Sequence, residues 1–99
     1  MGWAAGHIAR LQNGETVSFR PRGNSMKGKI ESGSLCVVEP ATAAKVAAGE
    51  LVLCKVKGTE YLHLVKAVGP DGRVLIGNNI GRTNGWTRAV FGRLVRVED

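Results

Sequence analysis

Short apolar segments separated by glycine-containing turns constrain the fold of this chain more than any other feature. The 99 residues include 14 glycines, and Pro40 directly follows one of the apolar runs. A turn at Gly69–Gly72 and a tight hairpin at Gly58-Thr59 would join neighbouring runs. Six runs have the alternating or apolar pattern of strands: 16–20, 35–39, 50–57, 60–68, 73–76 and 90–97. This pattern predicts an all-β fold, a compact antiparallel β-barrel or sandwich-like domain with little helix.

The remaining segments add little regular structure. Residues 1–15 are expected to form an N-terminal arm, and residues 16–99 a single β domain. Thr42 could cap one or two turns of helix that run to Ala48, because Gly49 follows as a typical helix end. Residues 77–85 are polar and predict a long loop, and Gly92 could interrupt the last strand.

Composition limits the class of protein. A chain of 99 residues with 43% hydrophobic residues is long enough for one globular domain. We find no run long enough to span a membrane and no secretory signal, so we expect a soluble, cytoplasmic protein without membrane contact. Cys36 and Cys54 lie in apolar strands and are expected to be reduced core thiols, although a disulfide between them stays open. No spacing indicates a metal site or a cofactor.

Lys66 has an unusual position in the predicted strand 60–68. Side chains alternate along a strand, so Leu62, Leu64, Lys66 and Val68 would share one face. A lysine on an apolar face either extends its ammonium to water or is desolvated and neutral. A neutral amine can act as a general base. The chain also offers a nucleophile in a tight loop, at Ser25.

The residues around Ser25 resemble the first signature of the serine–lysine peptidases, which include LexA-type autoproteases and type I signal peptidases. Ser25-Met26 matches the nucleophile and its neighbour, and Gly33-Ser34 matches the Gly-Asp turn that follows. Segments 49–53, 61–68, 77–79 and 90–95 are similar to later segments of these peptidases, in the same order. The sequence departs from the pattern at Ser34, Glu50, Asn78 and Ala67. It therefore resembles a divergent, stand-alone member.

The resemblance implies peptide-bond hydrolysis in cis or in trans. Ser25 would be the nucleophile and Lys66 the general base that accepts its proton. Backbone N–H groups of the loop, at Gly23, Asn24 and Met26, would bind the oxyanion. His63 would point to the opposite strand face from Lys66. The bond Ala5-Gly6 resembles the small-residue cleavage site of the autoproteases. The open alternative is a non-catalytic binding or inhibitory module on the same fold.

The net charge of +6 favours an acidic partner. We expect a peptide or protein substrate, with nucleic acid as a less favoured partner, and the sequence leaves a homodimer open. Cations around the predicted nucleophile would bind the partner: Arg20, Arg22, Lys27 and Lys29. A second group of cations follows later in the chain: Arg82, Arg88, Arg93 and Arg96.

Overall fold

The computed structural model describes residues 2–21 and 33–98. These residues form one helix, one 3-10 turn and seven strands, in chain order: α1 (Ala5–Gln12), β1 (Val17–Phe19), β2 (Leu35–Pro40), η1 (Ala43–Lys45), β3 (Leu51–Val56), β4 (Thr59–Val68), β5 (Val74–Gly77), β6 (Thr83–Thr87) and β7 (Val90–Glu98). The predicted mostly-β fold with antiparallel strands is confirmed. No helix among the described residues is long and apolar enough to cross a membrane.

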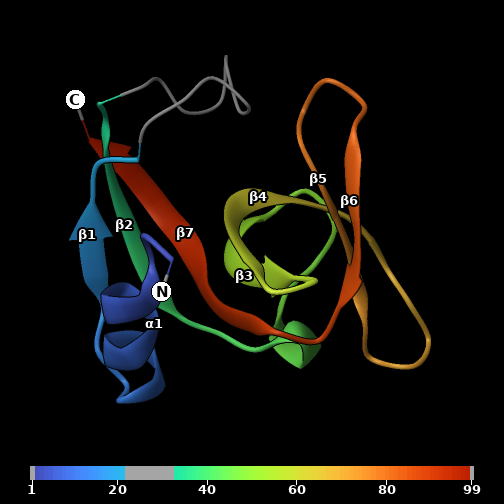
Figure 1. Cartoon of the computed structure of the whole chain (residues 1–99), viewed down its shortest axis with the longest axis horizontal. Helices are drawn as coiled ribbons and strands as arrows, with labels where there is room; N and C mark the ends of the chain where they lie inside the picture. Colours follow the sequence, from blue (N-terminus) through green and yellow to red (C-terminus); the bar gives the residue numbers. More distant parts are fainter. Residues whose placement is uncertain (1, 22–32, 99) are drawn as a thin grey trace.

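The strands form one curled antiparallel sheet in the order β1-β2-β7-β3-β4-β5-β6. Figure 1 shows α1 beside β1 and β2, and the curled strands β3 and β4 beside the long β5–β6 hairpin. The β6 end of the sheet returns to β3, because Thr87 Oγ1 donates to the Lys55 carbonyl at 2.7 Å. The amide of Lys55 in turn donates to the Ala89 carbonyl at 2.9 Å. We call this junction of β3 with residues 85–89 the seam.

Two hydrophobic clusters lie on opposite faces of β3. Leu53 is fully buried in the first cluster, which packs α1 against β1 and β2. Val52 and Cys54, its neighbours in sequence, are fully buried in the second cluster, inside the curl formed by β3–β6. Alternate residues of one strand thus serve two cores, which explains why the run 50–57 is almost continuously apolar.

Helix α1 replaces the arm expected for residues 1–15. Ile8 and Leu11 are buried against the first cluster, and Ala4 precedes them at helical spacing. The helix lacks a side-chain cap of its own. Instead, the amide of Ala4 donates to Oε1 of Glu60 at 3.0 Å, and Glu60 is only 7% exposed. A carboxylate at the positive end of the helix dipole is favourable, so β4 caps α1 through Glu60.

The N-terminal aromatic residues pack around β1. The ring of His7 stacks on Phe19 with centroids 4.5 Å apart. Trp3 contacts the same phenyl ring at 5.5 Å, while 53% of its surface stays exposed. Phe19 therefore connects α1 to the sheet through ring contacts as well as through the first cluster.

Three local predictions are wrong. The helix predicted from Thr42 to Ala48 is only the short turn η1, and the side chain of Thr42 makes no cap hydrogen bond. The β3–β4 turn consists of Lys57-Gly58 rather than Gly58-Thr59, because Val56 pairs with Thr59. Both turn residues have positive φ, as a two-residue hairpin turn of this kind requires. The predicted loop 77–85 contains the start of β6. The interruption predicted near Gly92 corresponds to a register shift: β7 continues through this residue, but Leu53 pairs with Gly92 and Cys54 with Val90, so Phe91 is an extra residue.

Cys36 and Cys54 are free and buried, as the sequence favoured. Burial raises the pKa of both thiols, that of Cys54 to about 12. Thiolates are the reactive form of cysteine, so these buried thiols are inert in the folded protein.

We expect neither cysteine to react with iodoacetamide at pH 8 in the folded protein, while both react in urea. Intact mass measures the number of labels. The raised pKa of Cys54 also makes the free energy of unfolding depend on pH. Between pH 9 and about 12 the unfolded thiol ionises while the folded thiol stays protonated. The free energy of unfolding should therefore fall as pH rises through this range. Rapid labelling of Cys54 without denaturant would contradict its burial.

Candidate active site around Lys66

Ser25, the predicted nucleophile, lies outside the residues that the structure describes. The same applies to Gly23, Asn24 and Met26 of the predicted oxyanion loop, and to the predicted partner-binding cations Arg22, Lys27 and Lys29. The two described ends that flank this segment are held together. Arg20 Nη1 donates to the Gly33 carbonyl at 2.7 Å, and the Gly33 amide donates to the Pro21 carbonyl at 3.3 Å.

Lys66 lies in a β-bulge on β4. Val65 pairs with Ile76 and Ala67 pairs with Leu75, so Lys66 is the extra residue without a partner across the ladder. Bulges bend a strand and change the direction of a side chain. Leu62 and Leu64 pack on the first cluster as one face of β4. The bulge ends that alternation, and Val68, predicted on the same apolar face, is 50% exposed.

The Lys66 side chain runs across Gly77 of the neighbouring strand. A Cβ added to Gly77 would lie 3.1 Å from Lys66 Cε and would overlap the carbonyl oxygen of Arg82. Lys66 is half-buried, and no carboxylate among the described residues forms an ion pair with it. Its methylene stem is thus packed against bare backbone, while its amine is not neutralised by a described acidic group.

The segment after Gly77 supports this packing. Asn78 is 7% exposed, and its Oδ1 accepts from the amides of Ile80 and Arg82 at 3.1 and 3.0 Å. Its own amide donates to the Arg82 carbonyl at 2.9 Å. One side chain therefore closes the β5–β6 connection. The carbonyl of Arg82 that this turn positions is the group that leaves no space for a side chain on Gly77.

His63 occupies a different environment from Lys66. It is 8% exposed, and its Nδ1 lies 2.8 Å from Oδ1 of Asn84. An amide oxygen only accepts, so Nδ1 carries the hydrogen in this pair. The Tyr61 ring lies 4.8 Å away on the same side of β4, and Tyr61 packs against the second cluster. The opposite placement of His63 and Lys66 stays a prediction, because the alternation on which it rests ends at the bulge. The contact with Asn84 was not predicted, because it depends on β6.

The second group of cations, Arg82, Arg88, Arg93 and Arg96, does not form a continuous patch of unpaired positive charge. Arg93 Nε donates to Glu39 at 2.6 Å, and its Nη1 lies 3.5 Å from Glu50. The hydrogen bond with Glu39 is the main cause of the raised pKa of Arg93. Arg96 pairs with Glu98 on the same strand. Arg82 and Arg88 form no ion pair with a carboxylate in the described part of the chain.

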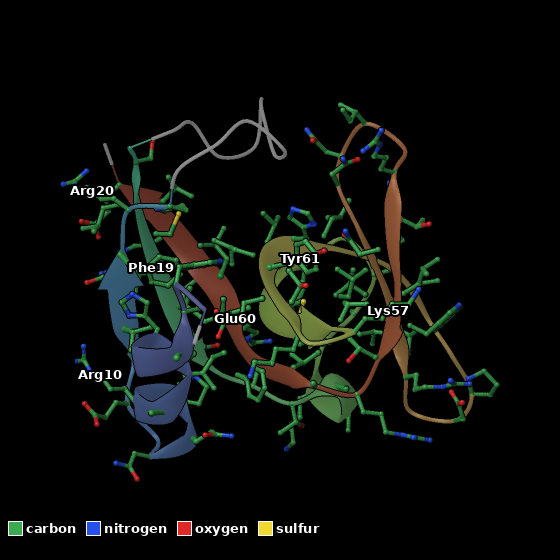
Figure 2. All side chains as sticks on the ribbon, in the orientation of Figure 1. Arg10, Phe19, Arg20, Lys57, Glu60 and Tyr61 are labelled. Atoms are coloured by element: carbon green, nitrogen blue, oxygen red, sulfur yellow. The ribbon has the colours of Figure 1, made fainter. Side chains whose placement is uncertain are left out.

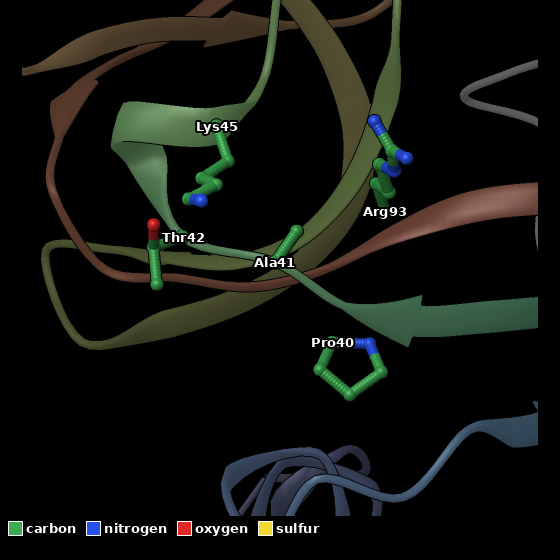
Figure 3. Close-up of a pocket in the computed structure, with 5 residues that line it drawn as sticks. All are labelled: Pro40, Ala41, Thr42, Lys45 and Arg93. Carbon is green, nitrogen blue, oxygen red and sulfur yellow. The ribbon is translucent and has the colours of Figure 1, made fainter.

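A shallow pocket of about 340 Å³ lies beside η1. Figure 3 shows its lining residues: Pro40, Ala41, Thr42, Lys45 and Arg93. Because Arg93 is paired with two carboxylates, Lys45 is the one lining residue with an uncompensated charge. Lys66 is not among the described residues that line this pocket. Within residues 2–21 and 33–98, no group of three potential ligand side chains could hold a metal ion.

Comparisons with known proteins leave the chain without an assigned family. No protein-family model matches the sequence, and no curated protein or solved structure shows significant similarity to it.

Proposed function

We propose that this protein is a serine–lysine peptidase-like hydrolase, with Ser25 as nucleophile and Lys66 as general base. The observation that carries the proposal is the position of Lys66. It is a half-buried lysine in a β-bulge, its stem packed on Gly77, without a carboxylate partner in the described structure. General-base catalysis needs a lysine amine that is not held in an ion pair with a carboxylate, and Lys66 meets this requirement among the described residues.

The proposed chemistry has two steps. The neutral Lys66 amine accepts the Ser25 hydroxyl proton as the oxygen attacks the peptide carbonyl, and the lysine ammonium then donates that proton to the leaving amine. A water molecule next attacks the acyl-serine and gives a proton to Lys66. The lysine ammonium then returns this proton to the Ser25 oxygen as the bond to the acyl group breaks, which releases the acid and restores both residues. Backbone N–H groups of residues 23–26 would stabilise the oxyanion in both steps.

The fold bears on the proposed self-cleavage at Ala5-Gly6. This bond lies in the first turn of α1, and Ala4 beside it is fully buried. A peptide bond must be extended to enter a protease site, so cleavage in cis would require this turn to unfold. The Glu60 contact to the Ala4 amide opposes that unfolding. Hydrolysis of a separate peptide in trans is therefore the favoured form of the reaction.

Mutation of the two residues tests the proposal. A mixture of unstructured synthetic peptides, some of them acidic, is incubated with the protein from pH 7 to pH 10, and mass spectrometry detects cleavage products. We expect Ser25→Ala to abolish cleavage, and Lys66→Met to do the same because it keeps the aliphatic stem but removes the amine. Ser18→Ala is the matched control, since Ser18 is an exposed serine on β1.

Three outcomes decide between the function classes. Loss of cleavage in both variants, with Ser18→Ala unchanged and the fold intact by circular dichroism, supports the hydrolase. Undiminished cleavage in Ser25→Ala refutes it. Absence of cleavage in the wild-type protein, together with full activity of Ser25→Ala in a cellular assay of its role, favours the non-catalytic binding module.

A further inference from the structure

The described carboxylates leave a defined set of cations uncompensated. Five of the six described carboxylates form ion pairs with arginine: Glu15, Glu39, Glu50, Asp71 and Glu98. Glu60 is the sixth and is buried under the start of α1. Seven lysine and arginine side chains have no carboxylate within ion-pair distance in the described structure: Arg20, Lys45, Lys55, Lys57, Lys66, Arg82 and Arg88. In the described part of the chain, the positive charge that carboxylates do not neutralise is therefore carried by these seven side chains.

Three of these seven cations gather at the seam. The backbone of Lys55 is hydrogen-bonded to Thr87 and to Ala89, the two residues that flank Arg88. Farther along the same antiparallel junction, Cε of Lys57 lies 3.9 Å from the position of a Cβ on Gly85. Figure 2 shows Lys57 beside the ribbon of β6. Lys55, Lys57 and Arg88 are all exposed. Lys55 and Lys57 follow β3 along the seam, and Nη2 of Arg88 donates to the Asp71 carbonyl of the β4–β5 turn at 3.0 Å. We call these three cations the row.

An exposed aromatic ring adjoins this row. Trp86 lies on β6 between Gly85 and Arg88 and is 46% exposed. A Cβ on Gly69 would lie 3.1 Å from Cζ3 of Trp86, so the edge of the indole packs against the backbone of the β4–β5 turn. Leu75 is its partner on the adjacent strand. The ring is thus held in place from one side and presents the rest of its surface to solvent.

We propose that this seam surface, made of Lys55, Lys57, Trp86 and Arg88, binds single-stranded nucleic acid. Cations next to an exposed, anchored aromatic ring match what such strands offer, since phosphates pair with Lys and Arg and bases stack on aromatic rings. Charge complementarity identifies the partner as a polyanion. A protein partner would need a larger apolar centre than one half-exposed indole. This binding is separate from hydrolysis and does not require Ser25 or Lys66.

The first test measures affinity and its salt dependence. Binding of a fluorescein-labelled oligothymidylate of about 20 nucleotides is followed by anisotropy at several salt concentrations. In the triple variant Lys55→Gln, Lys57→Gln, Arg88→Gln, we expect the slope of log affinity against log salt to become shallower by about 2, because each phosphate contact on a single strand contributes about 0.7.

A second triple variant controls for net charge. Arg10→Gln, Lys45→Gln, Arg96→Gln removes three exposed cations from other elements and therefore gives the same net charge. We expect it to keep most of the affinity and the wild-type slope. Equal weakening by the two triple variants would overturn the proposal, because binding would then depend on total charge rather than on the seam. Thermal melts confirm that both variants are folded.

The role of Trp86 is tested separately. Trp86→Ala should weaken oligothymidylate binding about 5- to 100-fold through loss of base stacking, and Trp86→Phe should restore most of the affinity. In a Trp3→Phe background, the remaining indole fluorescence should be quenched by the oligonucleotide. No binding of the oligonucleotide at low salt overturns the proposal. Binding of a synthetic peptide of alternating Glu and Leu in its place would assign the surface to an acidic protein.

Discussion

Replacing Gly92 by alanine is expected to lower the free energy of unfolding by about 1–3 kcal/mol or more, because the added methyl group has no space. A Cβ at this position would lie 2.6 Å from Cγ1 of Val38, 2.7 Å from the Glu39 carbonyl oxygen and 3.0 Å from Cδ1 of Leu11. One of these atoms belongs to the backbone of β2, which cannot move without disturbing its pairing with β7. Urea denaturation measures the loss, and the melting temperature should fall by about 4–8 °C per kcal/mol.

Gly6→Ala is the matched control for this substitution. Gly6 lies in α1, and a Cβ built on it meets nothing within 4 Å. Because alanine is a better helix former than glycine, we expect this variant to gain about 0.5–1 kcal/mol. Opposite signs for the same chemical change would show that local space, not the loss of a glycine, causes the effect at Gly92. A stability of Gly92→Ala equal to that of the wild type would contradict the close contact of β7 with β2 and α1.

Gly77→Ala should damage both the stability of the protein and the position of Lys66. The new methyl group would overlap the Arg82 carbonyl oxygen, which the Asn78 turn holds in place, and it would press on Cε of Lys66. We expect a loss of stability of about 1–3 kcal/mol from overpacking. We also expect Lys66 to move outward, because its stem is the more flexible neighbour.

The displacement of Lys66 can be measured without any hydrolase activity. Brief acylation with an amine-reactive reagent, followed by peptide mass spectrometry, should show faster labelling of Lys66 in Gly77→Ala than in the wild type. Exposed Lys57 serves as the internal reference within each sample. Peptide cleavage, if the proposed function holds, should fall in parallel. Unchanged labelling of Lys66 in a destabilised variant would mean that Gly77 supports the fold but does not position the amine.

Alternation and glycine position were sufficient to predict most strands. The observed strands β2, β3, β4, β5 and β7 match the runs 35–39, 50–57, 60–68, 73–76 and 90–97 to within one residue at each end. These segments are predictable because each carries an apolar side chain into a core at every second or every position. The same pattern predicted that Leu62 and Leu64 share a face of β4. Both residues pack on the first cluster, in agreement with this prediction.

Two elements were missed because their signals are weak in sequence. Helix α1 buries only the narrow stripe of Ile8 and Leu11. Its exposed residues Gly6 and Ala9 are small, so the segment resembles an irregular arm in the sequence. Strand β6 reads Thr-Asn-Gly-Trp-Thr, which lacks apolar alternation. It becomes a strand because β5 supplies backbone hydrogen bonds on one side, while the Thr87 hydroxyl donates to the Lys55 carbonyl of β3 on the other. Pairing with a distant partner thus outweighs low intrinsic strand preference.

The sequence by itself determined the fold class, the approximate positions of most strands and the unusual placement of a lysine on an apolar strand. Only the tertiary structure decided which residues meet. It placed Lys66 in a bulge over Gly77, put Glu60 under α1, neutralised Arg93 with Glu39 and Glu50, and left Lys55 without a carboxylate partner in the described structure. Strand periodicity acts between neighbours and is visible in a short window. Register, bulges and ion pairs depend on segments tens of residues apart, and no local pattern records them.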